Sequence, residues 1–467
     1  MTPRTIDTPA QLRAVMGAEF TFSDQQFTAV TAPLEPAVVI AGAGSGKTTV
    51  MAARVVWLVA TGQVAPAEIL GLTFTTKATA ELGARIRGAL RDAGLLPVRA
   101  EQDEEVEEPT VSTYHSYAAA LLSEHGLRIG HEPDTRLIAD ASRYQLATRA
   151  IQRYRRPVPH LTESPSHAVQ YLLALDSEMS EHLVSPEQVR AYDERHRALF
   201  VAGMEGESRK TYLADNQKAI RAIDARADLL GLVEAYRGLK TDLGLMDFSD
   251  QIALAAALAE QRREVGEIER GKFKVVLLDE YQDTSVAQAL MLSRLFSGPD
   301  PANGLGHPVT AVGDPNQAIY GWRGASVSNI LEFGRAFPVR RGATTTYPLT
   351  VNRRSDHRIL AAANHLAADL YAARPDLAPL EAKAKADAGH GEVRAAVHET
   401  WDDELSALAD QVIGAHHDAT PWRQIGVLTR DNTHAAAVFD ALTRREIPVE
   451  IVGLKGLLRL PEVAEVV

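Results

Sequence analysis

A glycine-rich loop at residues 41–48, which read AGAGSGKT, is the feature that most constrains how this chain can fold. It follows an apolar run at residues 38–40, and residues 48–59 continue with helical periodicity, so the loop joins a strand to a helix. Backbone N–H groups in such a loop can surround phosphate oxygens, and the N-terminus of the helix favours negative charge. The loop therefore predicts an α/β domain that binds a nucleotide; a glycine turn without a ligand is the alternative.

Two side chains of the loop have the chemistry that a nucleotide requires. Lys47 is suited to reach the β- and γ-phosphates, and Thr48 to ligate Mg²⁺ through its hydroxyl. Ala41 stands where the strict pattern has glycine, which is a small departure. The predicted nucleotide-binding residues of the loop are Ala43, Gly44, Ser45, Gly46, Lys47 and Thr48.

A second candidate half-site lies at residues 275–283, which read VVLLDEYQD. The apolar run predicts a buried strand, and α/β sheets bind ligands at the carboxyl ends of their strands, where Asp279 and Glu280 fall. Asp279 is suited to hold Mg²⁺ through its water shell, and Glu280 to orient and deprotonate an attacking water. An acidic pair can end a strand by chance, but together with a phosphate loop it predicts an ATPase that uses Mg²⁺.

A strand-then-helix rhythm continues beyond the loop, at residues 69–74 and 77–90, and it resumes at residues 273–278 and 309–312. Residues 122–243, in between, are almost wholly helical in pattern. The sequence therefore predicts a parallel α/β sheet that is interrupted by a helical insertion. The polar residues of the insertion include Arg149, Arg153, Arg155, Arg156, Arg190, Arg195 and Arg197.

A further α/β segment runs from about residue 344 to the end, with a strand predicted at residues 425–428. Several domains are expected, because 467 residues exceed one ordinary core. The predicted domains are residues 1–121 and 244–340 for the interrupted first domain, 122–243 for the insertion, and 341–467 for part of a second α/β domain.

Composition excludes several classes of protein. No run of 18 or more uncharged apolar residues could span a bilayer and no secretory signal is visible, so we expect a cytoplasmic protein without a membrane partner. The absence of cysteine excludes disulfides, zinc ribbons, iron–sulfur clusters and thiol catalysis in this stretch. A net charge of −12 argues against a general polyanion-binding coat but leaves room for a local basic groove.

Short segments in a fixed order identify a resemblance to superfamily 1 helicases of the UvrD/Rep/PcrA group. They are residues 22–26 (FSDQQ), 72–78 (LTFTTKA), 112–116 (STYHS), 246–250 (MDFSD) and 279–284 (DEYQDT). The resemblance implies a RecA-like P-loop NTPase fold, ATP and Mg²⁺ as cofactors, and single-stranded DNA and duplex junctions as partners. It implies that Gln26 reads the adenine base, since an amide can both donate and accept. The implied DNA-contact residues of these segments are Thr73, Phe74, Thr75, Tyr114 and His115; a core role is the alternative for Phe74.

Residues 312–325, which read VGDPNQAIYGWRGA, resemble the family segment that couples hydrolysis to DNA movement. Gln317 follows a predicted strand end and could sense the γ-phosphate. Tyr320 and Trp322 offer flat faces for unpaired bases, each worth about 1–3 kcal/mol, and Arg323 adjoins them. Stacking tolerates any base, as a motor on arbitrary sequence requires; ordinary core packing is the alternative for these aromatic rings.

Residues 349–355, which read LTVNRRS, resemble the segment that opens the family's second motor domain, with Arg354 in the place of an arginine that contacts the γ-phosphate. Two positions depart from the family pattern. Arg353 stands where a tyrosine usually stacks on adenine, and Thr49 stands where an arginine often packs on the other face. Base specificity therefore stays open. Arg430, at the end of the segment 425–430, is a candidate contact to the DNA backbone or a solvated surface residue.

Two later family motifs are absent, so we expect a fragment that ends near the family's second helical insertion. Residues 452–458 (VGLKGLL) are similar to actinobacterial helicase–nuclease subunits of the AdnA/AdnB kind, which implies a downstream nuclease domain and a partner subunit. The predicted function is ATP-driven 3′ to 5′ translocation and DNA unwinding in repair or recombination. The alternatives are an ATP- or DNA-binding module without turnover, and a phosphate-loop kinase, which would leave the tyrosine–tryptophan segment unexplained.

Overall fold

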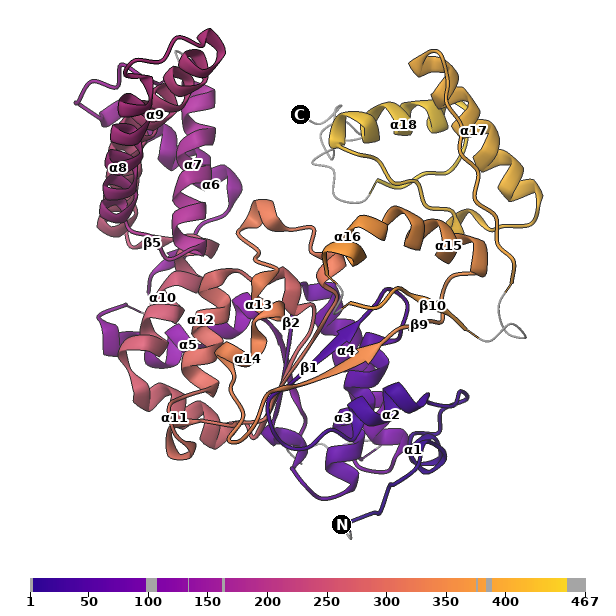
Figure 1. The fold of residues 1–467 in the computed structure, drawn as a ribbon. Helices are drawn as coiled ribbons and strands as arrows, with labels where there is room; N and C mark the ends of the chain where they lie inside the picture. Colours follow the sequence, from indigo (N-terminus) through magenta and orange to yellow (C-terminus); the bar gives the residue numbers. More distant parts are fainter. Residues whose placement is uncertain are drawn as a thin grey trace. The chain divides into compact units, whose positions relative to one another are not determined.

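The structure is a computed structural model that describes residues 3–97, 107–132, 134–161, 164–374, 377–383 and 389–451 (Figure 1). The chain divides into two compact units, Met1–Gly391 and Glu392–Val467. The segment 452–458, which carries the resemblance to helicase–nuclease subunits, lies outside the described residues. No helix in the described part of the chain combines the length and the apolar character needed to cross a membrane.

The first unit is built on a six-stranded sheet in the order β3-β2-β6-β7-β1-β8, with every neighbouring pair parallel. Strands β2 and β7 are buried along their whole length, as expected for apolar runs in a parallel sheet covered on both faces. This confirms the predicted α/β class with a parallel sheet. The strands are β1 (Ala37–Ala41), β2 (Ile69–Thr73), β3 (Thr110–Thr113), β6 (Val275–Leu278), β7 (Val309–Gly313) and β8 (Thr345–Leu349).

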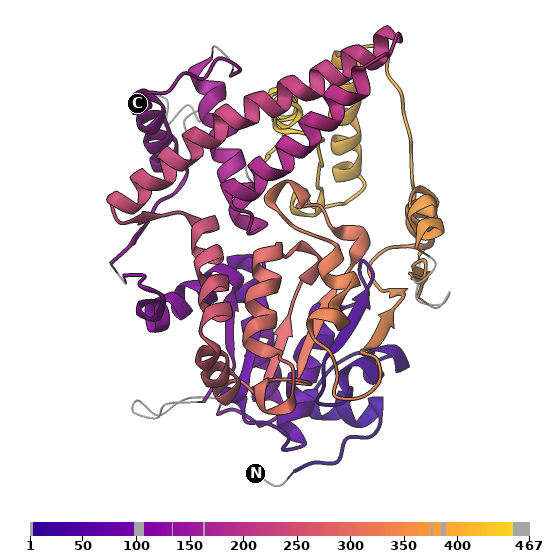
Figure 2. The ribbon, with the colours of Figure 1, turned by 60° about the vertical axis from the view of Figure 1, so that its left-hand side comes forward.

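Two helical layers cover the sheet, because alternate residues of each strand point to opposite faces (Figure 2). Val275 and Leu277 of β6 belong to one apolar core, and Val276 and Leu278 belong to the other. The first core is shared with α1 (Pro9–Met16), α2 (Asp24–Val30), α3 (Lys47–Ala60) and α4 (Thr76–Asp92). The second is shared with α5 (Tyr114–His125), α10 (Phe248–Gln261), α11 (Arg263–Lys272), α12 (Val286–Phe296), α13 (Ser328–Leu331) and α14 (Phe333–Ala336).

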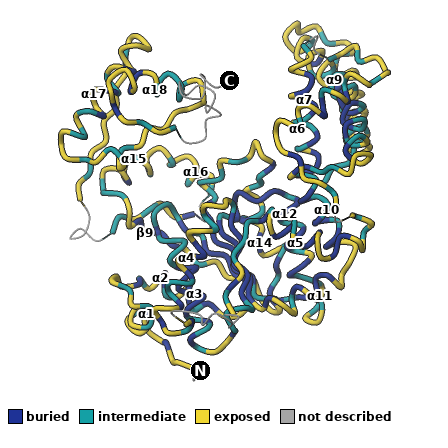
Figure 3. The backbone as a smooth tube through the Cα atoms, turned by 180° about the vertical axis from the view of Figure 1, so that it is seen from behind, coloured by how far each residue is buried: buried dark blue, intermediate teal, exposed yellow. Residues whose placement is uncertain are grey.

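Figure 3 shows the consequence of this layering: the strands of the sheet are drawn almost entirely as buried, while the outer faces of the helices are exposed. The carboxyl ends of the parallel strands all open on the same edge of the sheet. Short 3₁₀ turns follow two of these ends. They are η3 (Tyr281–Asp283) after β6, and η5 (Pro315–Gln317) and η6 (Gly321–Arg323) after β7.

The helical insertion has its own core, formed by residues such as Leu172, Leu230 and Tyr236. Its base is a two-stranded parallel pair, β4 (Arg136–Leu137) and β5 (Leu245–Met246), which brackets the insertion in the chain. The boundaries predicted at 121/122 and 243/244 stay predictions. The helices of the insertion are α6 (Asp140–Arg153), α7 (Pro165–Glu181), α8 (Pro186–Met204) and α9 (Lys210–Asp242).

The segment after residue 341 begins by extending the first sheet, since β8 pairs with β1 from Thr345 to Leu349. It continues with β9 (Val351–Asn352), α15 (His357–Leu366), α16 (Ala368–Ala373) and β10 (Glu381–Ala382), which pairs with β9. The second compact unit contains α17 (Trp401–His417), η7 (Trp422–Gln424) and α18 (Asn432–Arg444) around a small core.

The strand predicted at residues 425–428 is wrong, because the structure assigns no strand there. Val427 is 36% exposed and Leu428 is 99% exposed. The described residues of this unit contain no strand that could pair with the segment, and an apolar run without a pairing partner does not form a sheet.

Candidate nucleotide and nucleic-acid site

The glycine-rich loop lies between β1 and α3, as predicted, and two of its glycines adopt left-handed backbone conformations. Gly44 has φ 70° and Gly46 has φ 93°, and Gly46 is the N-cap of α3. Gly44 is also tightly packed, because a methyl group added there would lie 2.9 Å from Arg354 Cβ. A larger residue would meet both a strained φ and a clash, so glycine is required at this position.

The segment that follows β8 is fastened to the loop by hydrogen bonds. Asn352 donates from Nδ2 to the carbonyl of Ala43 at 2.6 Å, and the N–H of Arg353 donates to the carbonyl of Gly44 at 2.8 Å. Asn352 also accepts from the N–H of Arg354 through Oδ1, at 2.8 Å. The structure therefore brings Arg353 and Arg354, two predicted site residues, against the phosphate loop.

Lys47 is bound to the carboxylate strand end, with 2.7 Å between its Nζ and Glu280 Oε2. Glu280 has φ 48°, a left-handed conformation that costs a non-glycine residue about 1 kcal/mol or more. Such strain persists where the surroundings fix the residue, and it is most frequent at functional positions. The phosphate loop and the end of β6 therefore lie together, as expected for the two predicted halves of one nucleotide site.

Asp279 is 6% exposed and is held by its backbone. Its N–H donates to Leu72 at 2.8 Å, and its carbonyl accepts from the hydroxyl of Tyr114 at 2.9 Å. Burial raises the pKa of Asp279 to about 6, with a further contribution from Glu280 and an opposing one from Lys47. A nearby cation stabilises the ionised form of a carboxylate that is buried in this way.

Within the described part of the chain, two buried oxygens at this edge have no hydrogen-bond partner: Ser45 Oγ and Asp279 Oδ1. Burial is also the largest cause that raises the pKa of Asp283. Oxygen ligands suit Mg²⁺, and the unpaired carboxylate oxygen of Asp279 and the hydroxyl of Thr48, the residue after Lys47, are donors of the kind that fit this ion. The two predicted metal ligands, Thr48 and Asp279, are therefore chemically compatible with Mg²⁺.

Gln282 was missed by sequence reasoning, although it connects two parts of the site. Its Nε2 donates to Glu280 and to Asp283, each at 2.9 Å, and its Oε1 accepts from the N–H of Asp314 at 3.1 Å. Gln317, a predicted γ-phosphate sensor, donates from Nε2 to Asp314 Oδ2 at 2.6 Å. The only sequence signal for Gln282 was a polar residue directly after a strand-end carboxylate pair.

Gln26 reaches the phosphate loop, but both ends of its amide are engaged. Nε2 donates to the carbonyl of Ser45 at 3.0 Å, and Oε1 accepts from the N–H of Ser23 at 3.1 Å as part of a capping box on α2. One N–H and one lone pair of the amide are left for a further partner. Thr49 accepts at Oγ1 from Arg85 Nη1, at 3.1 Å, so a guanidinium that the sequence analysis did not select adjoins the loop.

A row of aromatic side chains lies on the same edge of the sheet. The ring centroids of Phe74 and Tyr320 are 4.9 Å apart, and those of Tyr320 and Trp322 are 6.4 Å apart. Trp322 is 68% exposed, and the guanidinium of Arg323 lies 4.5 Å from its ring centroid. These rings are a surface feature and not part of the core, and we call Phe74, Tyr320 and Trp322 the aromatic row.

A second aromatic pair contains one predicted DNA-contact residue, His115, and one residue that the sequence did not single out, Phe248. His115 meets Phe248 edge to face, with 5.6 Å between ring centroids, and Phe248 is 46% exposed. Burial lowers the pKa of His115, and the positive charge of Arg323 lowers it further. Phe248 is the first residue of α10, directly after the N-cap Asp247. A large aromatic residue at the polar start of a helix was the signal that could have selected it.

Two of the predicted DNA-contact residues are buried in the structure. Thr73 is 0% exposed, and its hydroxyl bonds to that of Thr79 at 2.8 Å. Tyr114 is 1% exposed, because its ring fills the core beneath β6 while its hydroxyl binds the Asp279 carbonyl. Both residues are placed to support the nucleotide edge from within. Thr75 is exposed as the N-cap of α4, and Arg430 is exposed in the second unit.

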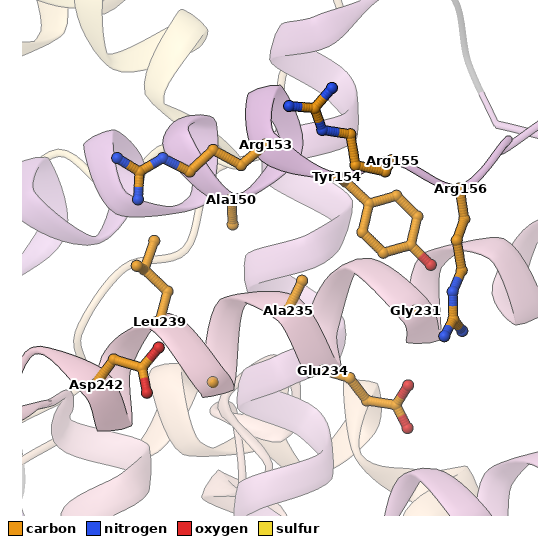
Figure 4. Close-up of a pocket in the computed structure, with 11 residues that line it drawn as sticks. Ala150, Arg153, Tyr154, Arg155, Arg156, Gly231, Glu234, Ala235, Leu239 and Asp242 are labelled. Atoms are coloured by element: carbon orange, nitrogen blue, oxygen red, sulfur yellow. The ribbon is translucent and has the colours of Figure 1, made fainter.

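The arginines of the insertion fall into two groups. Arg190 and Arg197 are in ion pairs, with Glu234 at 2.7 Å and Asp224 at 2.8 Å. Arg153, Arg155 and Arg156 have no ion-pair partner within the described part of the chain, and they surround a cavity of about 450 Å³ between the end of α6 and α9 (Figure 4). Glu234 and Asp242 line the same cavity, so its wall carries charges of both signs, and the three guanidiniums are its candidate anion-binding groups.

Comparison with known proteins gives two adjoining matches. Residues 22–338 match the UvrD/REP helicase N-terminal domain, and residues 347–467 match the UvrD-like helicase C-terminal domain. The chain is 29% identical over 446 residues to the ATP-dependent DNA helicase UvrD1 of Mycobacterium tuberculosis, covering 95% of this chain and 51% of that protein.

Two other relatives agree with this assignment. The chain is 27% identical over 431 residues to DNA helicase II of Haemophilus influenzae, and 26% identical over 434 residues to the ATP-dependent DNA helicase PcrA of Staphylococcus epidermidis. Each match covers 92% of this chain and 51% of the relative. The chain thus spans about half the length of the curated relatives it matches.

Proposed function

The chain belongs to the UvrD/REP helicase family, and we propose that it is the N-terminal part of an ATP-dependent 3′ to 5′ single-stranded DNA translocase and helicase. Repair or recombination of DNA in the cytoplasm would be its setting, and a partner subunit of a helicase–nuclease complex is part of the proposal. The observation that carries it is that the nucleotide edge, at Lys47 and Glu280, and the aromatic row belong to one edge of one sheet.

The nucleotide half of the proposal assigns each side chain a task. Lys47 exchanges its bond with Glu280 for the β- and γ-phosphates, which frees Glu280 to accept a proton from the attacking water. Asp279 and Thr48 would hold Mg²⁺, which neutralises charge on the phosphates when bound. Gln317 and Arg354 stabilise the γ-phosphate. The remaining nucleotide contacts are Gln26, Ala43, Gly44, Ser45, Gly46, Thr49 and Arg353.

The DNA half uses aromatic rings at the surface: Trp322 is exposed, and Phe74 and Tyr320 are half-buried. Bases stack on Phe74, Tyr320 and Trp322, and the pair His115 and Phe248 extends that surface. Thr75, Arg323 and Arg430 are proposed to contact the strand itself. Thr73 and Tyr114 are left out of this half, since neither has an exposed surface.

Coupling between the halves follows the hydrogen bonds through Gln282. Glu280 and the N–H of Asp314 bind the same amide, and Asp314 also binds Gln317 in the turn that leads to Tyr320. A change at Glu280 during hydrolysis therefore reaches the segment that carries two of the stacking rings. Motion of one motor domain against another would turn this into steps along the strand.

The duplex junction has its own candidate surface. Arg153, Arg155 and Arg156 around the cavity of the insertion present positive charge that would follow a phosphate backbone.

The test is DNA-stimulated ATP hydrolysis, measured for this chain and for a version of the protein that spans the length of its relatives. Turnover that rises with single-stranded DNA in the longer version supports the motor. Binding of ATP and DNA without turnover in both versions would favour the alternative, a binding module. DNA-independent transfer of phosphate to another acceptor would favour a kinase.

A further inference from the structure

A second cluster of ionisable side chains lies at the far end of α5. Glu124 and His125 are its last two residues, and Glu269 on α11 faces them. One donor atom from each of the three lies within 4.8 Å of the others. Helix α5 starts at Tyr114, which binds the Asp279 carbonyl, and its 12 residues span roughly 16 Å, so this cluster is separate from the nucleotide edge.

The histidine of this cluster is buried and lacks a hydrogen-bond partner. His125 is 5% exposed, and its Nε2 has no hydrogen-bond partner among the residues that the structure describes. That nitrogen points toward Glu124, with 3.6 Å between Nε2 and Oε1. Buried polar atoms nearly always have partners, so an unpaired imidazole nitrogen that faces two carboxylates needs an explanation.

Glu269 is 1% exposed and is oriented by a neighbour. Tyr117 donates from its hydroxyl to Glu269 Oε2 at 2.6 Å, while the tyrosine ring stacks on Phe296. Burial, followed by the charge of Glu269, raises the pKa of Tyr117, so the hydroxyl stays a donor. An outer group that fixes a carboxylate by a hydrogen bond is a common feature of metal sites.

The other cluster of this kind in the described residues behaves differently. Asp176, Asp247 and Asp250 also bring donor atoms within 4.8 Å of one another, but Lys240 Nζ lies among them at 2.7–3.2 Å. The position that a cation would take is therefore occupied by an ammonium group. No lysine or arginine forms an ion pair with Glu124 or Glu269 within the described part of the chain.

We propose that Glu124, His125 and Glu269 bind one divalent transition-metal ion, with Zn²⁺ as the best match, and that the ion clamps α5 to α11. Two carboxylates balance the charge of a divalent ion, and an imidazole ligand favours Zn²⁺ over Mg²⁺ or Ca²⁺. Zinc–ligand bonds of about 2.0–2.2 Å bring ligand atoms closer together than 4.8 Å, so small side-chain rotations would complete the site. The exposed side of Glu124 leaves room for a water molecule as fourth ligand.

The test uses the whole chain, freed of metal by a chelator and titrated with Zn²⁺ and with Co²⁺. We expect one Zn²⁺ per chain by calorimetry, a Co²⁺ absorption band in the visible range, and a rise in melting temperature with Zn²⁺. His125→Asn and Glu269→Gln should each weaken binding by about tenfold or more. Glu124→Gln should weaken it too, and this variant changes an exposed residue, so it will fold.

Matched controls separate this site from others. Glu264→Gln alters an exposed carboxylate on α11 that pairs with Arg128, and it should bind Zn²⁺ as the unmodified chain does. Asp279→Asn should also leave Zn²⁺ binding intact, which makes the result independent of the proposed ATPase. Unchanged Zn²⁺ affinity in both Glu124→Gln and His125→Asn would overturn the proposal. So would a metal-free chain in which nuclear magnetic resonance finds His125 protonated at neutral pH and Zn²⁺ fails to displace that proton.

Discussion

Two groups of three carboxylates in this chain are stabilised in opposite ways. At the base of the helical insertion, Asp176, Asp247 and Asp250 surround Lys240, and the three carboxylates together raise the pKa of this lysine above its usual value although burial alone would lower it. At the edge of the sheet, Asp279, Glu280 and Asp283 lie near one ammonium, that of Lys47, which forms an ion pair with Glu280 at 2.7 Å.

The difference separates a structural joint from a binding site. The first group is neutralised within the protein by Lys240, together with Arg143 on Asp247 and Arg237 on Asp176. It joins α7, α9 and α10, so the insertion is fixed to the sheet domain. The second leaves Asp279 Oδ1 without a hydrogen-bond partner among the described residues, and its lysine can move to a ligand. Buried charge without full compensation is costly in a fold, and a ligand can supply what is missing.

Replacing the proposed base should have the largest effect. We expect Glu280→Gln to lower DNA-stimulated turnover by about 10²- to 10⁴-fold while ATP still binds, because an amide cannot accept the proton of the attacking water. The measurement is steady-state ATPase beside nucleotide-binding titration. Asp250→Asn, from the joint, is the matched control and should keep turnover per folded molecule. A Glu280→Gln rate within tenfold of the unmodified rate would refute the assignment.

Removing the internal cation should affect folding instead of chemistry. Lys240→Met removes the ammonium that all three carboxylates contact, although Asp176 keeps Arg237 and Asp247 keeps Arg143 as ion-pair partners. We expect a loss of roughly 3 kcal/mol, the lower end of the cost of breaking a buried pair. Urea unfolding should report this loss of stability. Lys47→Met should cost much less, since the side chain of Glu280 is 34% exposed and water can replace the ammonium. Equal losses in the two variants would remove the distinction between joint and site.

A half-buried histidine at the opposite edge of the sheet, His307, tests the cost of burial at a ring with like charges nearby. Burial lowers the pKa of His307 to about 4, with Arg270 contributing, and the ring stacks on Phe296. The unfolded chain therefore binds a proton near pH 6.5 that the folded chain resists. Stability from this group is complete above pH 6.5 and is lost as the pH falls toward 4, by roughly 2–3 kcal/mol.

Comparison with His307→Gln isolates this contribution from the other acid-titrating groups. The difference in unfolding free energy between the two proteins should shrink between pH 7 and pH 4. A difference that does not change over this range would show that the folded protein accepts the proton freely.

Substitution in the aromatic row should have a smaller effect, and chiefly on DNA binding. Trp322→Ala removes one stacking surface, worth about 1–3 kcal/mol of DNA binding, and should reduce DNA stimulation more than ATP binding. Fluorescence anisotropy with a short single strand, beside ATPase, measures both. Trp401→Ala is a control in the second unit, where the ring is 43% exposed and packs on His434. Equal loss of ATP and DNA binding in Trp322→Ala would point to a structural role.

The central sheet could be predicted from the sequence, because the residue patterns that specify its strands and loops lie within short segments. The apolar run of β6 and the loop before α3 each encode burial and turn geometry within a few residues. Motif order then brought the candidate residues of the nucleotide edge together, and the structure places Lys47, Glu280 and Arg354 around one loop.

What could not be predicted depends on contacts between distant segments. Residues 425–428 have the composition of a strand, but pairing decides whether a strand forms, and periodicity carries no information about partners. Tyr114 looks like an exposed aromatic residue in the sequence, whereas packing under β6 buries it. Gln282 and Phe248 gain their importance only from neighbours that the fold supplies.

The smallest predicted effect concerns the insertion. It tests whether arginines without ion-pair partners mark a binding site for duplex DNA there. Arg153, Arg155 and Arg156 lie around the cavity without ion-pair partners in the described residues, whereas Arg197 is paired with Asp224. Replacing all three by alanine should weaken binding to a forked duplex and reduce the salt dependence of log K by about 3, one for each lost phosphate contact. Stimulation of ATPase by a single strand should be unchanged, and Arg197→Ala should behave like the unmodified protein. If the triple variant keeps the full salt dependence on forked DNA, unpaired arginines in this insertion do not mark a duplex surface, and the rule drawn from the two carboxylate groups does not extend to them.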